Sequence, residues 1–126
     1  MPPPTSTSSS TSSSKVTFRD LAQGQCAPLS GAGHRLDAAR LATLLALLPG
    51  WESDGNTIAK SFAFPDYETT MAFVNAVARI AQQQDHHPDI AFGYNRCRVA
   101  YSTHSVGGIS LNDFICAAKI EALTRP

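Results

Sequence analysis

The stretch "PDYETTMAFVNAVARIAQQQDHHPD", residues 65–89, predicts a long amphipathic helix with a defined start and a defined end. Asp66 suits the N-cap, because its carboxylate can accept a hydrogen bond from a free backbone N–H group, and Glu68 suits the positive end of the helix dipole. One apolar stripe has helical spacing: Phe73, Val77 and Ile80. Pro88 cannot continue a helix and favours an extended His87, so the paired histidines are expected on a constrained turn.

A second apolar stripe lies beside the first on the same predicted helix. Its members are Met71, Val74, Ala78 and Ala81. Together the two stripes cover a wider arc than a helix on a small sheet usually buries, which indicates burial against a second copy of the chain. We therefore expect a homo-oligomer, a dimer or a tetramer, with this helix at the centre of the assembly.

The residues before this helix predict another helix and a hairpin. In "HRLDAARLATLLALLPG", residues 34–50, four leucines have the spacing of one helical face, namely Leu41, Leu44, Leu45 and Leu48. Pro49 and Gly50 end that helix. In "WESDGNTIAKSFAF", residues 51–64, the turn residues Asp54–Asn56 separate two extended runs, and the second run alternates large and small residues as a half-buried strand does.

The residues after the histidine pair predict a second hairpin and a last helix. Gly93 and Asn95 lie near the turn, and "RCRVAYSTH", residues 96–104, reads as a strand. Alternation places Cys97, Val99, Tyr101 and Thr103 on one face, and Arg98, Ala100, Ser102 and His104 on the other. The last helix is predicted at residues 111–123, where Ser110 and Asp113 have the spacing of a capping box. Its buried stripe is expected to consist of Leu111, Ile115, Ala118 and Ala122.

These elements follow one another in the order α-β-β-α-β-β-α. Hairpins on either side of a helix predict an α+β fold, a four-stranded antiparallel sheet with three helices packed on one face. Residues 16–126 are expected to form a single domain, with an irregular segment at 15–33. Residues 1–15 are rich in Ser and Thr and predict a disordered tail, with the remnant of a targeting peptide as the alternative.

Composition excludes several classes of protein. The ten basic and ten acidic residues balance and form no basic stripe, so no nucleic-acid surface is expected. The run "LATLLALL" is too short to span a bilayer, so no membrane segment is expected. The three cysteines, Cys26, Cys97 and Cys116, have wide spacings that suggest no disulfide framework, which favours a reducing compartment and a cytoplasmic protein.

Three histidines lie at the ends of predicted elements: His86, His87 and His104. Imidazole has an unperturbed pKa of about 6.5, so such groups can transfer protons near neutral pH. Each histidine could instead cap a helix or fill a polar gap. A metal site is a third alternative, although adjacent histidines rarely bind one ion and no cysteine or i, i+4 histidine pair supports zinc. The residue types alone leave these alternatives open.

The motif "DHHPD" at residues 85–89, the aromatic Tyr94 and the run "STHSVGGISLND" at residues 102–113 resemble the pterin-4a-carbinolamine dehydratases. The resemblance extends from about Leu36 to Leu123 and includes the predicted order of elements. It implies dehydration of 4a-hydroxytetrahydropterins to quinonoid dihydropterins, which returns the pterin cofactor used by aromatic amino-acid hydroxylases. It also implies that no metal or organic cofactor is required, and that the protein is a dimer or a tetramer.

The resemblance assigns roles to individual residues. His86 and His104 correspond to the acid-base groups, and His87 to the histidine that mainly holds the pterin. The substrate-binding residues implied by the resemblance are Gln82, Asp85, Pro88, Ile90 and Asp113. Two of these depart from the family pattern, since Gln82 replaces an ionisable residue and Ile90 replaces a frequent tryptophan.

Two further functions remain as alternatives to the enzyme. Some animal members of the family bind the dimerisation helix of a transcription factor, and the second stripe could serve such binding. A pterin-binding homologue without turnover is the other alternative, because the amide of Gln82 cannot stabilise an imidazolium by charge.

Overall fold

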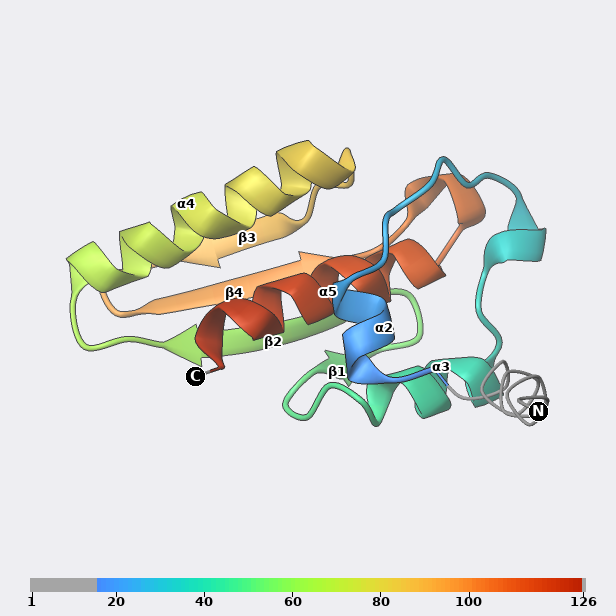
Figure 1. Ribbon diagram of the computed structural model, residues 1–126, viewed down its shortest axis with the longest axis horizontal. Helices are drawn as coiled ribbons and strands as arrows, with labels where there is room; N and C mark the ends of the chain where they lie inside the picture. The colour runs from blue at the N-terminus through green and yellow to red at the C-terminus, as the bar shows by residue number, and fades with distance from the viewer. Residues whose placement is uncertain (1–15, 126) are drawn as a thin grey trace, which may run out of the picture.

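The computed structural model describes residues 16–125 and consists of one antiparallel sheet with helices on one face (Figure 1). The strands are β1 (Glu52–Ser53), β2 (Ile58–Ala63), β3 (Asp89–Phe92) and β4 (Arg96–Tyr101), in the order β1-β2-β4-β3. All three pairings are antiparallel, so the predicted α+β fold and both hairpins are confirmed. The predicted tail at residues 1–15 lies outside the described residues.

The register of the sheet aligns the apolar positions of neighbouring strands. Ile58 of β2 pairs with Tyr101 of β4, and Phe62 pairs with Cys97. All four side chains are buried, as the period of two along each strand predicts. On the other face of β4, Arg98 is exposed, whereas the small side chain of Ala100 is buried.

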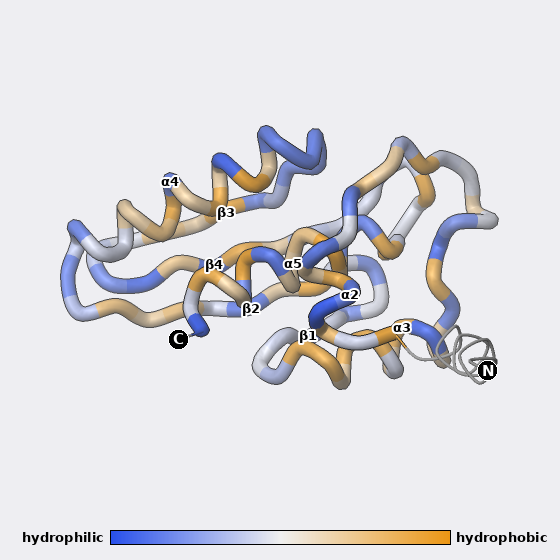
Figure 2. Tube along the Cα trace, viewed as in Figure 1, coloured by the Kyte–Doolittle hydropathy of each residue, from blue (hydrophilic) through white to orange (hydrophobic). Residues whose placement is uncertain are grey.

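Two long helices cover the inner face of the sheet. α4 (Tyr67–Gln84) contacts β3 and β4, and α5 (Leu111–Thr124) lies between α4 and the shorter α3 (Ala38–Leu45) in Figure 1. The predicted caps are confirmed, since Asp66 accepts from Thr69 N–H and Ser110 forms a capping box with Asp113. Figure 2 shows hydrophilic residues gathering where α4 ends.

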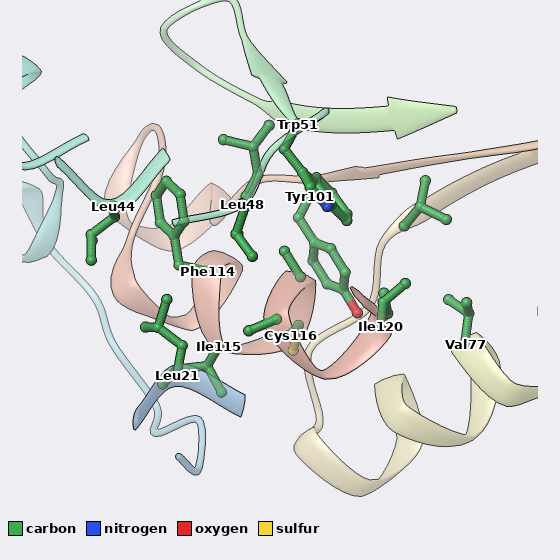
Figure 3. Packing of buried hydrophobic residues seen from close by; sticks show 14 of the residues in the cluster. Leu21, Leu44, Leu48, Trp51, Val77, Tyr101, Phe114, Ile115, Cys116 and Ile120 are labelled. Carbon is green, nitrogen blue, oxygen red and sulfur yellow. The ribbon is translucent and has the colours of Figure 1, made fainter. Parts of the chain in front are cut away.

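The predicted buried stripe of α5 is too narrow. Seven consecutive residues, 112–118, are buried, whereas Leu111 is only partly buried and Ala122 is exposed. The cause is α2 (Phe18–Ala22), which packs on the outer side of α5 and adds a second buried face. Figure 3 shows Leu21 of this helix directed at α5 beside Ile115.

The segment expected to be irregular therefore contains a helix. Thr17 and Asp20 form a capping box at the start of α2, and Leu21 is 2% exposed. The signal was present in the sequence, because Thr17-x-x-Asp20 has capping-box spacing before an apolar residue. A short 3-10 helix, η1 (Ala32–His34), follows in the same segment.

Two other helix predictions need correction. The first predicted helix is shorter than its leucine pattern, because α3 ends at Leu45 while Leu48 is buried beyond it. On α4, Ala81 of the second stripe is buried within the protomer. Met71 and Val74 are partly buried, so Ala78 is the member of that stripe that is exposed.

No helix among residues 16–125 is long and apolar enough to cross a membrane.

Candidate functional site

A tight turn after α4 sets the position of the histidine pair. Asp85 is the C-cap residue and has left-handed backbone angles, φ 52° and ψ 43°. The N–H group of His86 donates to the carbonyl oxygen of Ala81 at 3.1 Å, which holds the turn against the last turn of the helix. The constrained turn predicted from Pro88 is thus present, and the two histidine side chains point to different partners.

His86 forms a close pair with Asp113. His86 Nε2 lies 2.6 Å from Asp113 Oδ1, and the side chains are 13% and 0% exposed. Because the carboxylate accepts the proton on Nε2, the neutral imidazole carries its lone pair on Nδ1. Nδ1 is therefore the ring nitrogen that can exchange a proton with another molecule.

The carboxylate of Asp113 is held by three other residues. Its Oδ2 accepts from Thr103 Oγ1 at 2.8 Å and from Ser110 N–H at 2.9 Å, while Oδ1 faces His86. Thr103 and Ser110 also bond to each other through their hydroxyl groups at 2.7 Å. A buried carboxylate needs such partners, since an unpaired charge in the interior is costly. The predicted capping role is confirmed, and the same carboxyl group also holds His86.

The surroundings of His86 favour its charged form. Burial by itself lowers the pKa of His86, but the hydrogen bond and the charge of Asp113 outweigh burial and raise the pKa above its usual value of 6.5. The ring of Tyr101 stacks on the imidazole, with centroids 5.2 Å apart and an interplanar angle of 16°. The Tyr101 hydroxyl donates to the carbonyl oxygen of His86 at 3.3 Å, so the tyrosine supports both the ring and the backbone.

His87 has a different and more exposed environment. Its Nε2 lies 2.9 Å from Gln82 Oε1. The amide of Gln82 therefore contacts His87 and not His86, whose acidic partner is Asp113. The departure at position 82 affects the second histidine of the pair.

A pocket of about 540 Å³ opens beside His86. The end of α4 contributes Gln83, Gln84, Asp85 and His86, and further walls come from Thr103, Ser105 and Asn112. The remaining wall is the N-terminal segment at residues 26–30. This volume is in the range typical of small-molecule sites.

The third predicted histidine lies elsewhere. His104 is exposed on the 3-10 helix η2 (His104–Val106) and lines a separate hollow of about 260 Å³. Thr103 lines both hollows, so the structure places His86 and His104 on two sides of one residue and not in one pocket. Ile90, predicted to contact substrate, packs against the hydrophobic core. Pro88 is partly buried in the turn.

Sequence reasoning missed several residues of this site. Alternation places Tyr101 and Thr103 on one face of β4, and that pattern could have indicated that they lie close to the helices. The pocket wall at residues 26–30 carried no comparable signal. Among residues 16–125, no cluster of three or more His, Cys, Asp or Glu side chains could hold a metal ion.

Comparisons with known proteins find similar sequences over most of the chain. The family model described as "Pterin 4 alpha carbinolamine dehydratase" matches residues 34–123. A protein of Nitrosospira multiformis named "Putative pterin-4-alpha-carbinolamine dehydratase" is 54% identical over 108 residues, covering 86% of this chain and 96% of its own. A relative of the same name from Stenotrophomonas maltophilia is 56% identical over 107 residues, covering 83% and 92%.

A solved structure is also similar. The "transcriptional coactivator/pterin dehydratase" from Brucella melitensis superposes with a TM-score of 0.69 at 35% identity, covering 72% of this chain and 99% of that one.

Proposed function

The chain belongs to the pterin 4 alpha carbinolamine dehydratase family, and from this premise we propose that it dehydrates 4a-hydroxytetrahydropterins to quinonoid dihydropterins. The observation that supports this most strongly is the buried Asp113 paired with His86 at 2.6 Å beside a pocket of about 540 Å³. A positioned imidazole with a raised pKa suits proton transfer near neutral pH.

The proposed reaction removes water from the pterin ring. The C4a–O bond breaks as the hydroxyl group accepts a proton and leaves as water, and the proton on N5 is lost as the C4a–N5 double bond forms. His86 supplies the first proton from Nδ1, because Nε2 is held by Asp113. Asp113 positions the ring and stabilises the imidazolium, and it remains a carboxylate throughout.

His104 is the proposed second proton-transfer group, and His87 the proposed group that holds the pterin. A substrate that contacts both His86 and His104 has to reach across Thr103, which lines both hollows. Among the other substrate contacts inferred from the family, Asp85 lines the pocket of His86, and Gln82 acts through its bond to His87.

The proposed role in metabolism is to return the pterin cofactor to aromatic amino-acid hydroxylases, which is the role of the family. A cytoplasmic location is proposed because Cys26, Cys97 and Cys116 are all free thiols. The relative from Brucella melitensis is named a transcriptional coactivator as well as a pterin dehydratase, and this supports a second candidate function, binding of another protein.

A dehydration assay separates these functions. The substrate is a 4a-hydroxytetrahydropterin generated in situ, and formation of the quinonoid product is followed by absorbance with and without the protein. The proposal expects dehydration well above the uncatalysed rate. Pterin binding by calorimetry without acceleration would indicate a homologue without turnover, and neither binding nor acceleration would favour the protein-binding function.

A further inference from the structure

Two cysteines that are far apart in the sequence meet next to the pocket. Cys26 Sγ lies 3.5 Å from Cys116 Sγ, although 90 positions separate them. Cys26 belongs to the N-terminal segment that follows α2, and Cys116 lies in the middle of α5. Both are free thiols in contact, and the third cysteine, Cys97, is buried on β4.

Hydrogen bonds hold the N-terminal segment, and with it the Cys26 thiol, against α5. The backbone N–H of Cys26 donates to Gln84 Oε1 at 2.8 Å, and its thiol donates to the carbonyl oxygen of Asn112 at 3.6 Å. The Asn112 side chain accepts from Ala27 N–H at 3.1 Å and donates to Ala27 O at 2.7 Å. Gln84 and Asn112 thus hold the backbone at residues 26 and 27, which keeps the sulfur of Cys26 against that of Cys116.

The two thiols differ in access and in acidity. Cys26 is partly buried and lines the pocket, whereas Cys116 is fully buried behind it. The hydrogen bond from Cys116 and the charge of Lys119 lower the pKa of Cys26, and they outweigh burial and the charge of Asp113, which raise it. The hydrogen bond with Cys26 and then burial raise the pKa of Cys116. Cys26 is therefore the more accessible and the more acidic of the two thiols, and we expect it to react first, with Cys116 as its resolving partner.

We propose that Cys26 and Cys116 form a peroxide-sensitive pair that closes to a disulfide and alters the pocket of His86. The Cys26 thiolate attacks the O–O bond of a hydroperoxide, which yields a sulfenic acid on Cys26 and, from hydrogen peroxide, hydroxide. The Cys116 sulfur then attacks the Cys26 sulfur, and the Cys116 proton leaves with the sulfenic hydroxyl as water. The hydroxide takes up the proton that Cys26 released on ionisation, so two thiols and one hydrogen peroxide give one disulfide and two waters.

The disulfide changes the geometry around His86. A disulfide brings its sulfur atoms to about 2.0 Å, so the 3.5 Å separation has to shorten by about 1.5 Å. Cys26 is part of the pocket wall and moves toward α5 as the bond forms. In Figure 3 Cys116 lies near the hydroxyl end of Tyr101, whose ring stacks on His86. We therefore expect oxidation to change the surroundings of the His86 imidazole in two places, at the pocket wall and at the stacked ring of Tyr101.

Peptide mapping after oxidation tests the pair directly. The reduced protein is treated with a small excess of hydrogen peroxide, and remaining thiols and disulfide-linked peptides are measured without reductant. We expect the wild type to lose two of its three thiols and to give one linked pair, Cys26 with Cys116. The matched control Cys97→Ser should form the same link, while Cys26→Ser and Cys116→Ala should form none within the chain.

Other results of the mapping would overturn the pair. These are a wild type that keeps all its thiols, a link that contains Cys97, or a Cys26 that links only to a second chain. The wild-type measurement decides the matter by itself if the Cys116 variant does not fold.

The effect on the pocket rests on the proposed dehydratase function and is measured separately. We expect oxidation to raise the KM for the pterin several-fold in the wild type and in Cys97→Ser, to leave KM unchanged in Cys26→Ser, and to be reversed by dithiothreitol. A mapped disulfide with an unchanged KM would refute the effect on the pocket. If the protein shows no dehydration at all, the function fails while the mapping still tests the thiol pair.

Discussion

Asp113 uses its two carboxylate oxygens for two purposes. One oxygen caps α5 through Ser110 N–H, and the other holds His86. Capping-box spacing predicts the first role, but it gives no reason to expect the second. An imidazole bonded to a carboxylate in this way keeps one tautomer and gains basicity.

Replacing Asp113 by asparagine should lower the pKa of His86. The variant keeps the size of the side chain but removes the charge that, with its hydrogen bond, raises this pKa. Because the folded-state pKa is raised, the stabilisation is fully present below about pH 6.5 and is lost as pH rises through the folded-state value. NMR titration of His86 should show the lower pKa in Asp113→Asn. Denaturation should show a stability difference from wild type that shrinks as pH rises above about 6.5 through the raised folded-state pKa, and a constant difference would contradict the coupling.

Replacing Gln82 by glutamate should act on His87. Gln82 Oε1 is 2.9 Å from His87 Nε2, so a carboxylate at this position would stabilise the His87 imidazolium. The NMR titration midpoint of His87 should move to higher pH than in wild type. The control is Gln83→Glu, which adds the same charge one residue away and should move the midpoint less. Equal shifts in the two variants would show that the contact does not control His87.

At the scale of elements, periodicity and capping chemistry predicted most of the fold. The caps Asp66 and Ser110, the turn at Asp54–Asn56 and the break at Pro88 act locally, so the sequence shows them directly. The width of the buried face of α5 could not be read in this way, because it depends on α2, which is distant in the chain. The pocket wall at residues 26–30 was not predictable for the same reason.

Truncation of Leu21, the buried side chain of α2, tests how much this helix stabilises the domain. Leu21 is 2% exposed, and truncation of a buried leucine to alanine costs about 2–5 kcal/mol. Leu21→Ala should therefore lower the free energy of unfolding by an amount in this range, measured by chemical denaturation. Leu123→Ala is the control, because Leu123 is 46% exposed and its loss should change stability by less than about 0.5 kcal/mol. Equal effects of the two changes would mean that α2 does not stabilise the domain.

At the scale of the whole molecule, the outer face of α4 is the predicted centre of a homo-oligomer. Burial of Ala81 within the protomer narrows that face to Met71, Val74 and the exposed Ala78. Large exposed aromatic residues also remain on the protomer, among them Phe92 on the edge strand β3 and Tyr94. Exposed apolar side chains such as these could contribute to contacts between copies of the chain.

A charge at Ala78 should disrupt an assembly centred on α4. Ala78→Asp leaves the protomer unstrained because the side chain is exposed, but in a symmetric contact each copy would bury an unpaired carboxylate. Light scattering should show a smaller particle than the wild type. Ala72→Asp makes the same change at another exposed position of α4, outside the second stripe, and should leave the mass unaltered. A monomeric wild type, or no change on Ala78→Asp, would rule out this interface.

The central claim is that His86, held by Asp113, transfers a proton during pterin dehydration, and the kcat of His86→Ala tests it most directly. General acid-base groups typically contribute at least about 10²-fold, so kcat should fall by about that factor with the circular dichroism spectrum unchanged. The control His34→Ala removes an exposed histidine outside the pocket and should keep wild-type kcat. A folded His86→Ala variant with near wild-type kcat would contradict the account.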